Sequence, residues 1–181
     1  MGADQVLWGR LRAMGNDDWV SPAGNKYPED EDNDADNYDR AHEDFLSFWH
    51  QRELEAKLKP RANLIGIDLK HQYLVGINLA EANLYGSNLF HTNLTSANLY
   101  SANLESANIR LANLNNATLS FANLSKADLS ETNLVCANLY SVNLYCADLR
   151  GSNLKGANLG NANLFCADFS GATMPDGTIH E

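Results

Sequence analysis

The chain has 181 residues, of which 44% are apolar, enough for one packed domain with an appended segment. Its formal net charge is -10; residues 1–60 hold 14 acidic and 7 basic side chains, and residues 61–181 hold 9 and 6. Neither part is basic, which argues against direct nucleic-acid binding, because a surface that binds phosphates must neutralise them. An acidic chain suits a protein partner better.

The first residues of the chain and the spacing of its cysteines indicate the cellular compartment. The first residues lack the basic start and continuous apolar stretch of a signal peptide, and no run of about 18 apolar residues occurs anywhere. The three cysteines, Cys136, Cys146 and Cys166, form neither an even disulfide framework nor a zinc-binding C-x-x-C pair. We therefore expect a cytoplasmic protein without a membrane segment.

The first third of the chain divides into two predicted parts. Residues 1–38 read as an acidic, partly ordered extension, in which Trp8 and Trp19 argue against complete disorder. Residues 39–60 are typical of an amphipathic helix, with Phe45, Leu46 and Trp49 on one side. We expect this helix to cover the open end of the repeat domain that follows, the alternative being a helix that binds a partner.

A repeat of five residues dominates the rest of the chain. From Leu64 to Phe169 an apolar residue recurs every fifth position, 22 times without a break. Asn or Asp usually precedes it, and a small residue, mostly Ala, stands one position earlier. Because five fits neither the 3.6-residue period of a helix nor the alternation of a strand, the chain must turn at each unit.

Four such turns predict a square coil of about twenty residues, stacked one strand spacing, about 4.8 Å, from the next. The Leu and Ala side chains point inward and the Asn lies between them. The last residue of each unit becomes the third residue of a β-turn, where glycines such as Gly66, Gly86 and Gly151 permit the positive φ of a type II turn. In the middle coils this position holds other residues, for which we predict a turn nearer type I: Ser101, Ser106, Leu111 and Phe121.

This repeat resembles the signature of the pentapeptide-repeat family, a small residue, Asp or Asn, Leu or Phe, then two variable positions. The match runs from Ala62 to Gly171, and the closing residues 172–179, Ala-Thr-Met-Pro-Asp-Gly-Thr-Ile, look like those of short cyanobacterial members. The resemblance implies an all-β solenoid, the right-handed quadrilateral β-helix, which we place at residues 61–174 with a tail at 175–181. The first coil departs from the signature and is predicted to be distorted or adapted to a cap: Ile67, Gln72, Tyr73 and Ile77.

No motif for catalysis or for a cofactor is present, neither a Ser-His-Asp order, a Cys-His pair nor a phosphate loop. His71 and His91 are stacked by the twenty-residue period, but two histidines fall short of the four ligands of structural zinc. We predict a protein that is not an enzyme and that has no cofactor or metal.

Outward aromatic residues are the candidate interaction surface. Their alternative explanation is good β propensity and stacking along the solenoid. The period places Tyr145 beside Phe165 and Cys146 beside Cys166, where the sulfurs come within reach of a disulfide, although free thiols suit a reducing compartment better. The candidate aromatic residues are Tyr85, Phe90, Tyr100, Tyr140, Tyr145 and Phe165.

Three functions remain open. The first is a scaffold or regulator that binds an unknown protein, as cyanobacterial members of the resembled family do. The second, also from the resemblance, is a DNA-mimicking modulator of DNA gyrase, which the charge of about -3 on residues 61–181 disfavours. The third is a redox-responsive surface at Cys146 and Cys166. A homodimer through the C-terminal coil is a further expectation, with the alternative that residues 174–179 cover that coil.

Overall fold

The computed structural model describes Leu54 and residues 56–181. Leu54, Ala56 and Lys57 are helical, and the repeats begin a few residues later. The extension predicted at residues 1–38, and residues 39–53 and 55 of the helix predicted at 39–60, lie outside the described residues. Among the described residues, no helix has the length and apolar character needed to cross a bilayer.

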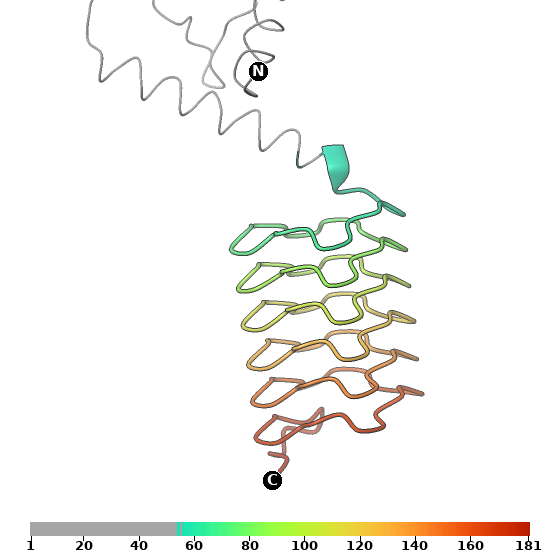
Figure 1. Ribbon diagram of the computed structural model, residues 1–181. Coiled ribbons are helices and arrows are strands. Elements are labelled where there is room, and N and C mark those ends of the chain that lie inside the picture. Colours follow the sequence, from blue (N-terminus) through green and yellow to red (C-terminus); the bar gives the residue numbers. More distant parts are fainter. Residues whose placement is uncertain (1–53, 55) are drawn as a thin grey trace, which may run out of the picture. The chain divides into compact units, whose positions relative to one another are not determined.

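The repeats wind into a stack of square coils (Figure 1). On each side of a coil, one residue forms a parallel β-bridge with the residue twenty positions later. The first of these bridges joins Asn63 to Asn83, and the last joins Asn153 to Thr173. Backbone hydrogen bonds join neighbouring coils at every side; the Leu84 nitrogen, for example, donates to the Asn103 carbonyl at 2.7 Å. Four units of five residues therefore make one coil, and each bridged residue pairs with the residue twenty positions later, as predicted.

The inward leucines and alanines form the core. Leu69, Leu84, Leu104 and Leu124 are fully buried, and Ala82 and Ala102 lie beside them with at most 1% exposure. The threonine hydroxyls at the alanine position bond inside the tube, as when Thr92 Oγ1 donates to the Leu69 carbonyl at 2.8 Å, whereas the buried hydroxyls of Ser87 and Ser152 have no hydrogen-bond partner among the described residues. One large and one small side chain per side thus fill the narrow interior.

The predicted change of turn type in the middle coils is wrong. The third turn residue has φ between 52° and 71° at every fifth position from Arg61 to Gly171, and 17 of these positions are not glycine. Only type II turns combine this φ with a negative φ at the preceding residue. The positions we expected to differ, Ser101, Ser106, Leu111 and Phe121, all have φ of 52° to 61°.

The inter-coil hydrogen bonds explain why the turn type does not change. The peptide between Glu105 and Ser106 accepts from the Gly86 nitrogen at 2.9 Å on one side and donates to the Ser125 carbonyl at 3.0 Å on the other. A type I turn would flip this peptide and lose both bonds. Their retention outweighs the cost of a left-handed backbone, roughly 1–2 kcal/mol for a residue with a Cβ.

The first coil is regular, so of the two outcomes predicted for it distortion is wrong, while adaptation to a cap concerns a helix that lies almost entirely before the described repeats. The nitrogens of Leu64, Leu69 and Leu74 donate to the next coil at 2.7 to 2.8 Å, as in the interior. Ile67 and Gln72 stand at small-residue positions and are half-buried. Main-chain bonds set the coil, and side chains at its end have room that interior alanines lack.

The C-terminal hairpin covers only part of the last coil. Residues 172–180 fold back as a hairpin, in which Thr173 pairs antiparallel with Ile179 and the His180 nitrogen donates to the Ala172 carbonyl at 2.9 Å. The His180 ring lies 5.9 Å from that of Phe169, which is 7% exposed. Leu164, on the preceding side of the coil, is 37% exposed.

Candidate interaction surface

Asparagine ladders orient the outward side chains. On the side that contains Asn143 and Asn163, the Asn163 amide donates to Asn143 Oδ1 at 2.9 Å, and the chain of amides continues back to Asn83. The same Oδ1 atoms accept the backbone nitrogens two residues later, those of Tyr145 and Phe165, each at 3.2 Å. The repeated Asn therefore fixes the start of each turn and the direction of the residue displayed on it.

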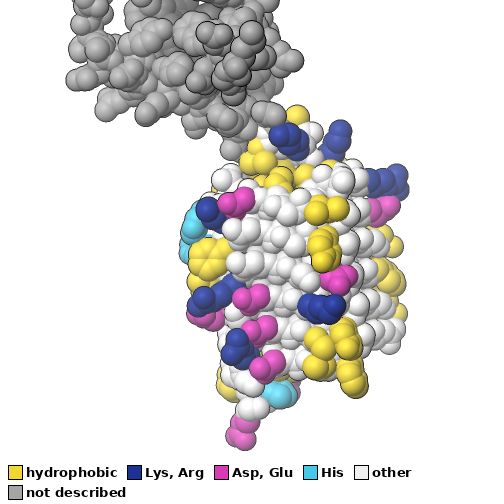
Figure 2. Space-filling model, viewed as in Figure 1, with side chains coloured by type: hydrophobic (Ala, Val, Ile, Leu, Met, Phe, Trp, Pro, Cys, Tyr) yellow, Lys and Arg dark blue, Asp and Glu magenta, His cyan; other side chains and the backbone are white. Residues whose placement is uncertain are grey.

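Tyr145 and Phe165 stack at the C-terminal end of this corner. Their ring centroids are 5.9 Å apart and their planes 6° from parallel. Tyr145 is 40% exposed and Phe165 71% exposed. Cys146 and Cys166 occupy the next turn position beside them, half-buried and exposed respectively. We call these four residues the C-terminal patch; in Figure 2 a group of apolar side chains lies near the C-terminal end of the coils.

A second aromatic row lies one corner away. Phe121 is packed edge-on between Tyr100 and Tyr140, at centroid distances of 5.7 and 5.8 Å. The Asn161 amide donates to the Tyr140 hydroxyl at 2.8 Å. All three rings are between 38% and 51% exposed. The row is self-supporting, because each ring already has a neighbour above or below it.

Phe90 belongs to a third corner, together with the histidine pair. His71 and His91 lie 5.3 Å apart by ring centroids, and Phe90 contacts His71 at 5.5 Å. In the part of the chain that the structure describes, no group of three or more His, Cys, Asp or Glu side chains is placed to hold a metal.

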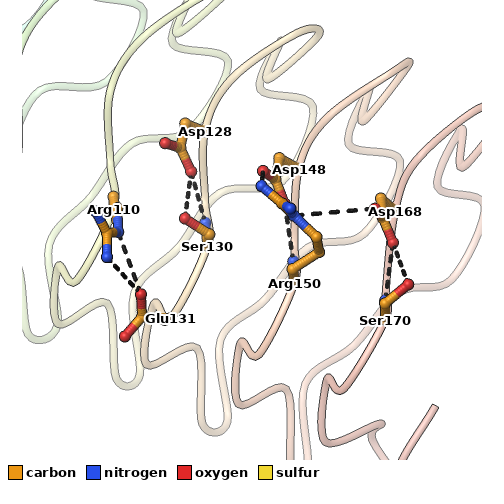
Figure 3. A network of polar contacts seen from close by, with 8 residues as sticks. All are labelled: Arg110, Asp128, Ser130, Glu131, Asp148, Arg150, Asp168 and Ser170. Carbon is orange, nitrogen blue, oxygen red and sulfur yellow. Dashed lines mark hydrogen bonds and ion pairs between the residues drawn. The ribbon is translucent and has the colours of Figure 1, made fainter. Parts of the chain in front are cut away.

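The fourth feature is a network of charges on the side that bears Asp128, Asp148 and Asp168 (Figure 3). Arg150 lies between two carboxylates, 2.6 Å from Asp148 and 3.9 Å from Asp168. Its hydrogen bond lowers the pKa of Asp148, while hydrogen bonds from Ser170 are the main cause of the lowered pKa of Asp168. Arg110 pairs with Glu131 at 2.7 Å nearby. The acids of this side are therefore partly neutralised by their own chain.

The six predicted aromatic residues do not form one surface. Tyr145 and Phe165 meet, Tyr100 and Tyr140 are joined only through Phe121, and Phe90 faces another corner. Tyr85 shares the corner of the C-terminal patch, but Glu105 and Lys126, 3.6 Å apart, lie between them. The space-filling view likewise shows exposed apolar groups separated by charged side chains (Figure 2).

The sequence pattern does not identify two residues of the exposed surface, Phe121 and Leu164. Phe121 is predicted only as a turn residue, although the twenty-residue period places it at the same corner as Tyr100 and Tyr140, in the coil between theirs. Leu164 was counted as core because its place in the repeat is an inward one. Its exposure follows from its position in the last coil, and the period of five carries no sign of it.

Comparisons with known proteins agree with this geometry. The family model described as pentapeptide repeats matches residues 62–99, 78–116, 112–145 and 143–176. Among curated proteins, none matches the chain.

Solved structures that are similar to the chain include two cyanobacterial proteins and a resistance protein. A pentapeptide repeat protein, Rfr23, from the cyanobacterium Cyanothece 51142 is 27% identical, over 72% of this chain and 97% of its own, with a TM-score of 0.47. HetL, a pentapeptide repeat protein involved in heterocyst differentiation regulation in the cyanobacterium Nostoc sp. strain PCC 7120, is 30% identical, over 66% and 77%, with a TM-score of 0.26. QnrB1, a plasmid-mediated fluoroquinolone resistance protein, is 18% identical, over 59% and 52%, with a TM-score of 0.54.

Proposed function

Because the chain belongs to the pentapeptide-repeat family, we propose that it is a non-enzymatic scaffold or regulator that binds another protein through its rigid solenoid, with the C-terminal patch as the contact. The observation that carries this proposal is the stacked and exposed pair Tyr145 and Phe165. Aromatic side chains are enriched at protein interfaces because they bury much apolar area with little loss of conformational freedom.

The backbone supports a binding role for these rings. Hydrogen bonds to neighbouring coils and the asparagine ladder hold the turns of Tyr145 and Phe165 before a partner arrives. A surface that is ordered in advance loses less entropy on binding than a loop that must be ordered. The polar asparagines that flank the rings would form the hydrated rim usual at interfaces.

DNA mimicry has weaker support in the charges. A mimic of duplex DNA needs a sustained negative surface, whereas residues 61–181 hold 9 acidic and 6 basic side chains. Arg150 and Arg110 pair with acids of the most acidic side. The likeness to QnrB1, at 18% identity, concerns the fold alone.

The test is affinity capture with the full chain as bait, beside a Tyr145→Ser, Phe165→Ser variant. Tyr85→Ser is the matched control, since Tyr85 is 45% exposed at the same corner but lies outside the patch. We expect a protein retained by the wild type and by Tyr85→Ser to be lost from the double variant, and the loss to recur with the purified partner.

Retention of that protein by the double variant would place the contact elsewhere and reject the patch. Purified DNA gyrase is offered to the same baits as a separate arm. Its binding to all three would favour the mimic instead.

A further inference from the structure

Cys146 and Cys166 occupy equivalent positions in neighbouring coils. Asn143 and Asn163 form a parallel bridge three residues before them, and the Cys146 nitrogen donates to the Phe165 carbonyl at 3.0 Å. In this register the two cysteine Cα atoms are separated by one strand spacing, about 4.8 Å. Disulfides span Cα distances of about 4.4 to 6.8 Å, so the separation of these two residues lies within the range that a disulfide can bridge.

The two thiols also influence one another. Hydrogen bonding with Cys146, followed by the repulsion between two negative charges, raises the pKa of Cys166. The contact between Cys146 and the Tyr145 hydroxyl likewise raises the pKa of Tyr145. Loss of a second proton from the cysteine pair is therefore disfavoured. Once one of the two cysteines has lost its proton, a thiolate faces a thiol.

Both sulfurs are free and open to small reagents, since Cys166 is exposed and Cys146 is half-buried. Cys136 provides a contrast within the same chain. It is exposed at another corner, where the corresponding positions of the neighbouring coils hold Asn116 and Gly156 rather than a second cysteine. The paired arrangement is therefore specific to Cys146 and Cys166.

We propose that Cys146 and Cys166 are a modification site, at which a peroxide oxidises the two thiols to a reversible disulfide that links the last two coils. The thiolate of one cysteine attacks the peroxide oxygen, which gives a sulfenic acid and releases one water after protonation. The second thiol then attacks the sulfenic sulfur, the S–S bond forms, and a second water leaves. In sum, two thiols and one hydrogen peroxide give one disulfide and two waters.

The disulfide adds a covalent link to the hydrogen bonds between the last two coils. At this corner the Leu144 nitrogen donates to the Asn163 carbonyl, the Cys146 nitrogen to the Phe165 carbonyl and the Asp168 nitrogen to the Ala147 carbonyl. Leu164, in this segment of the last coil, is 37% exposed. A covalent link here slows local opening, and amide hydrogen exchange at Cys146 and Asp168 reports that change without reference to any partner.

The experiment uses the full chain carrying Cys136→Ser, so that only the pair remains. Serine already stands at the same turn position in Ser106, with φ of 57°, so the coil accepts it. The reduced protein is treated with hydrogen peroxide, alkylated and digested with trypsin without reduction. The expected product joins the tryptic peptides Ala127–Arg150 and Gly156–Glu181. Dithiothreitol separates them, and exchange at Cys146 and Asp168 slows at least several-fold in the oxidised form.

Two controls make the outcome decisive. The Cys136→Ser, Cys166→Ser variant must give no linked peptide. A mixture of nitrogen-15-labelled and unlabelled protein separates a bond within one chain from a bond between two. The proposal is overturned if the treated cysteines are recovered as sulfinic or alkylated residues without a link. Links found only between labelled and unlabelled chains overturn it as well.

Discussion

Leu124 and Leu164 occupy the same place of the repeat on the same side of the solenoid, yet Leu124 is fully buried and Leu164 is 37% exposed. Leu124 has coils on both sides, whereas Leu164 lies in the last coil. The five-residue pattern is identical around the two residues, Ala-Asn-Leu in both cases. Their energetic roles should therefore differ although their sequence context does not.

Truncation of these two leucines tests this difference. Leu124→Ala leaves a cavity in a filled tube and should lower the free energy of unfolding by about 2–5 kcal/mol. Leu164→Ala removes a side chain that is partly in water and should cost clearly less, about 1–2 kcal/mol. Urea unfolding followed by circular dichroism measures both. Equal losses would mean that something covers Leu164 in solution.

The left-handed turn residues give a second prediction. Ser106 has φ of 57° and is exposed, so Ser106→Gly should raise the free energy of unfolding by up to about 1 kcal/mol as backbone strain is relieved. Ser106→Val should lower it, since β-branching disfavours this φ further. Asn115, the second residue of its turn, has no positive φ.

Asn115→Gly serves as the control for the same assay. It should lower stability by about 0.5–1 kcal/mol, because glycine adds freedom to the unfolded chain without relieving strain. A stability loss of that size for Ser106→Gly would contradict the type II turn in the middle coils.

Acid should weaken the solenoid through its carboxylates. The pKa values of Asp148 and Asp168 are lowered in the folded state, by Arg150 and by Ser170 respectively. A depressed folded pKa contributes stability above the unfolded value of about 3.9, and this contribution is lost as the pH falls through the folded value. The melting temperature should therefore be steady near neutral pH and fall below about pH 4.

The matched variant for the acid response is Asp148→Asn, Asp168→Asn. Asparagine is the usual residue at this place in the repeat and accepts the same backbone hydrogen bond, as Asn143 does from the Tyr145 nitrogen at 3.2 Å. The variant should fold and show a smaller drop in melting temperature between neutral and acid pH. An unchanged drop would assign the acid response to other carboxylates.

The exposed pair Tyr145 and Phe165 should matter little for folding. Phe165 is 71% exposed and its main loss on truncation is the ring contact, worth about 0.5–1.5 kcal/mol. Phe165→Ser should therefore lower the free energy of unfolding by no more than about 1.5 kcal/mol, measured by urea unfolding. A larger loss would give the pair a structural role, and a loss of binding in the variant would then need a different explanation.

The repeat alone predicted the larger part of the fold, because the residues of each unit show which side chains are buried and which are exposed. Leu at every fifth position and Ala two residues before it define an inward face, and four turns are needed to bring successive units to one axis. The same period placed Tyr145 beside Phe165 and Cys146 beside Cys166. Periodic neighbours can be read from a sequence because register in a solenoid is set by counting.

Interactions between coils and the ends of the stack could be decided only by the tertiary structure. The type II turns at Ser106 and Leu111 persist because the turn peptides bond to the coils on both sides, a constraint that the unit itself does not contain. The regular first coil, the exposure of Leu164 and the hairpin at residues 172–180 depend on what lies above or below a unit. A repeat determines its own shape, whereas burial and turn strain are settled by its neighbours.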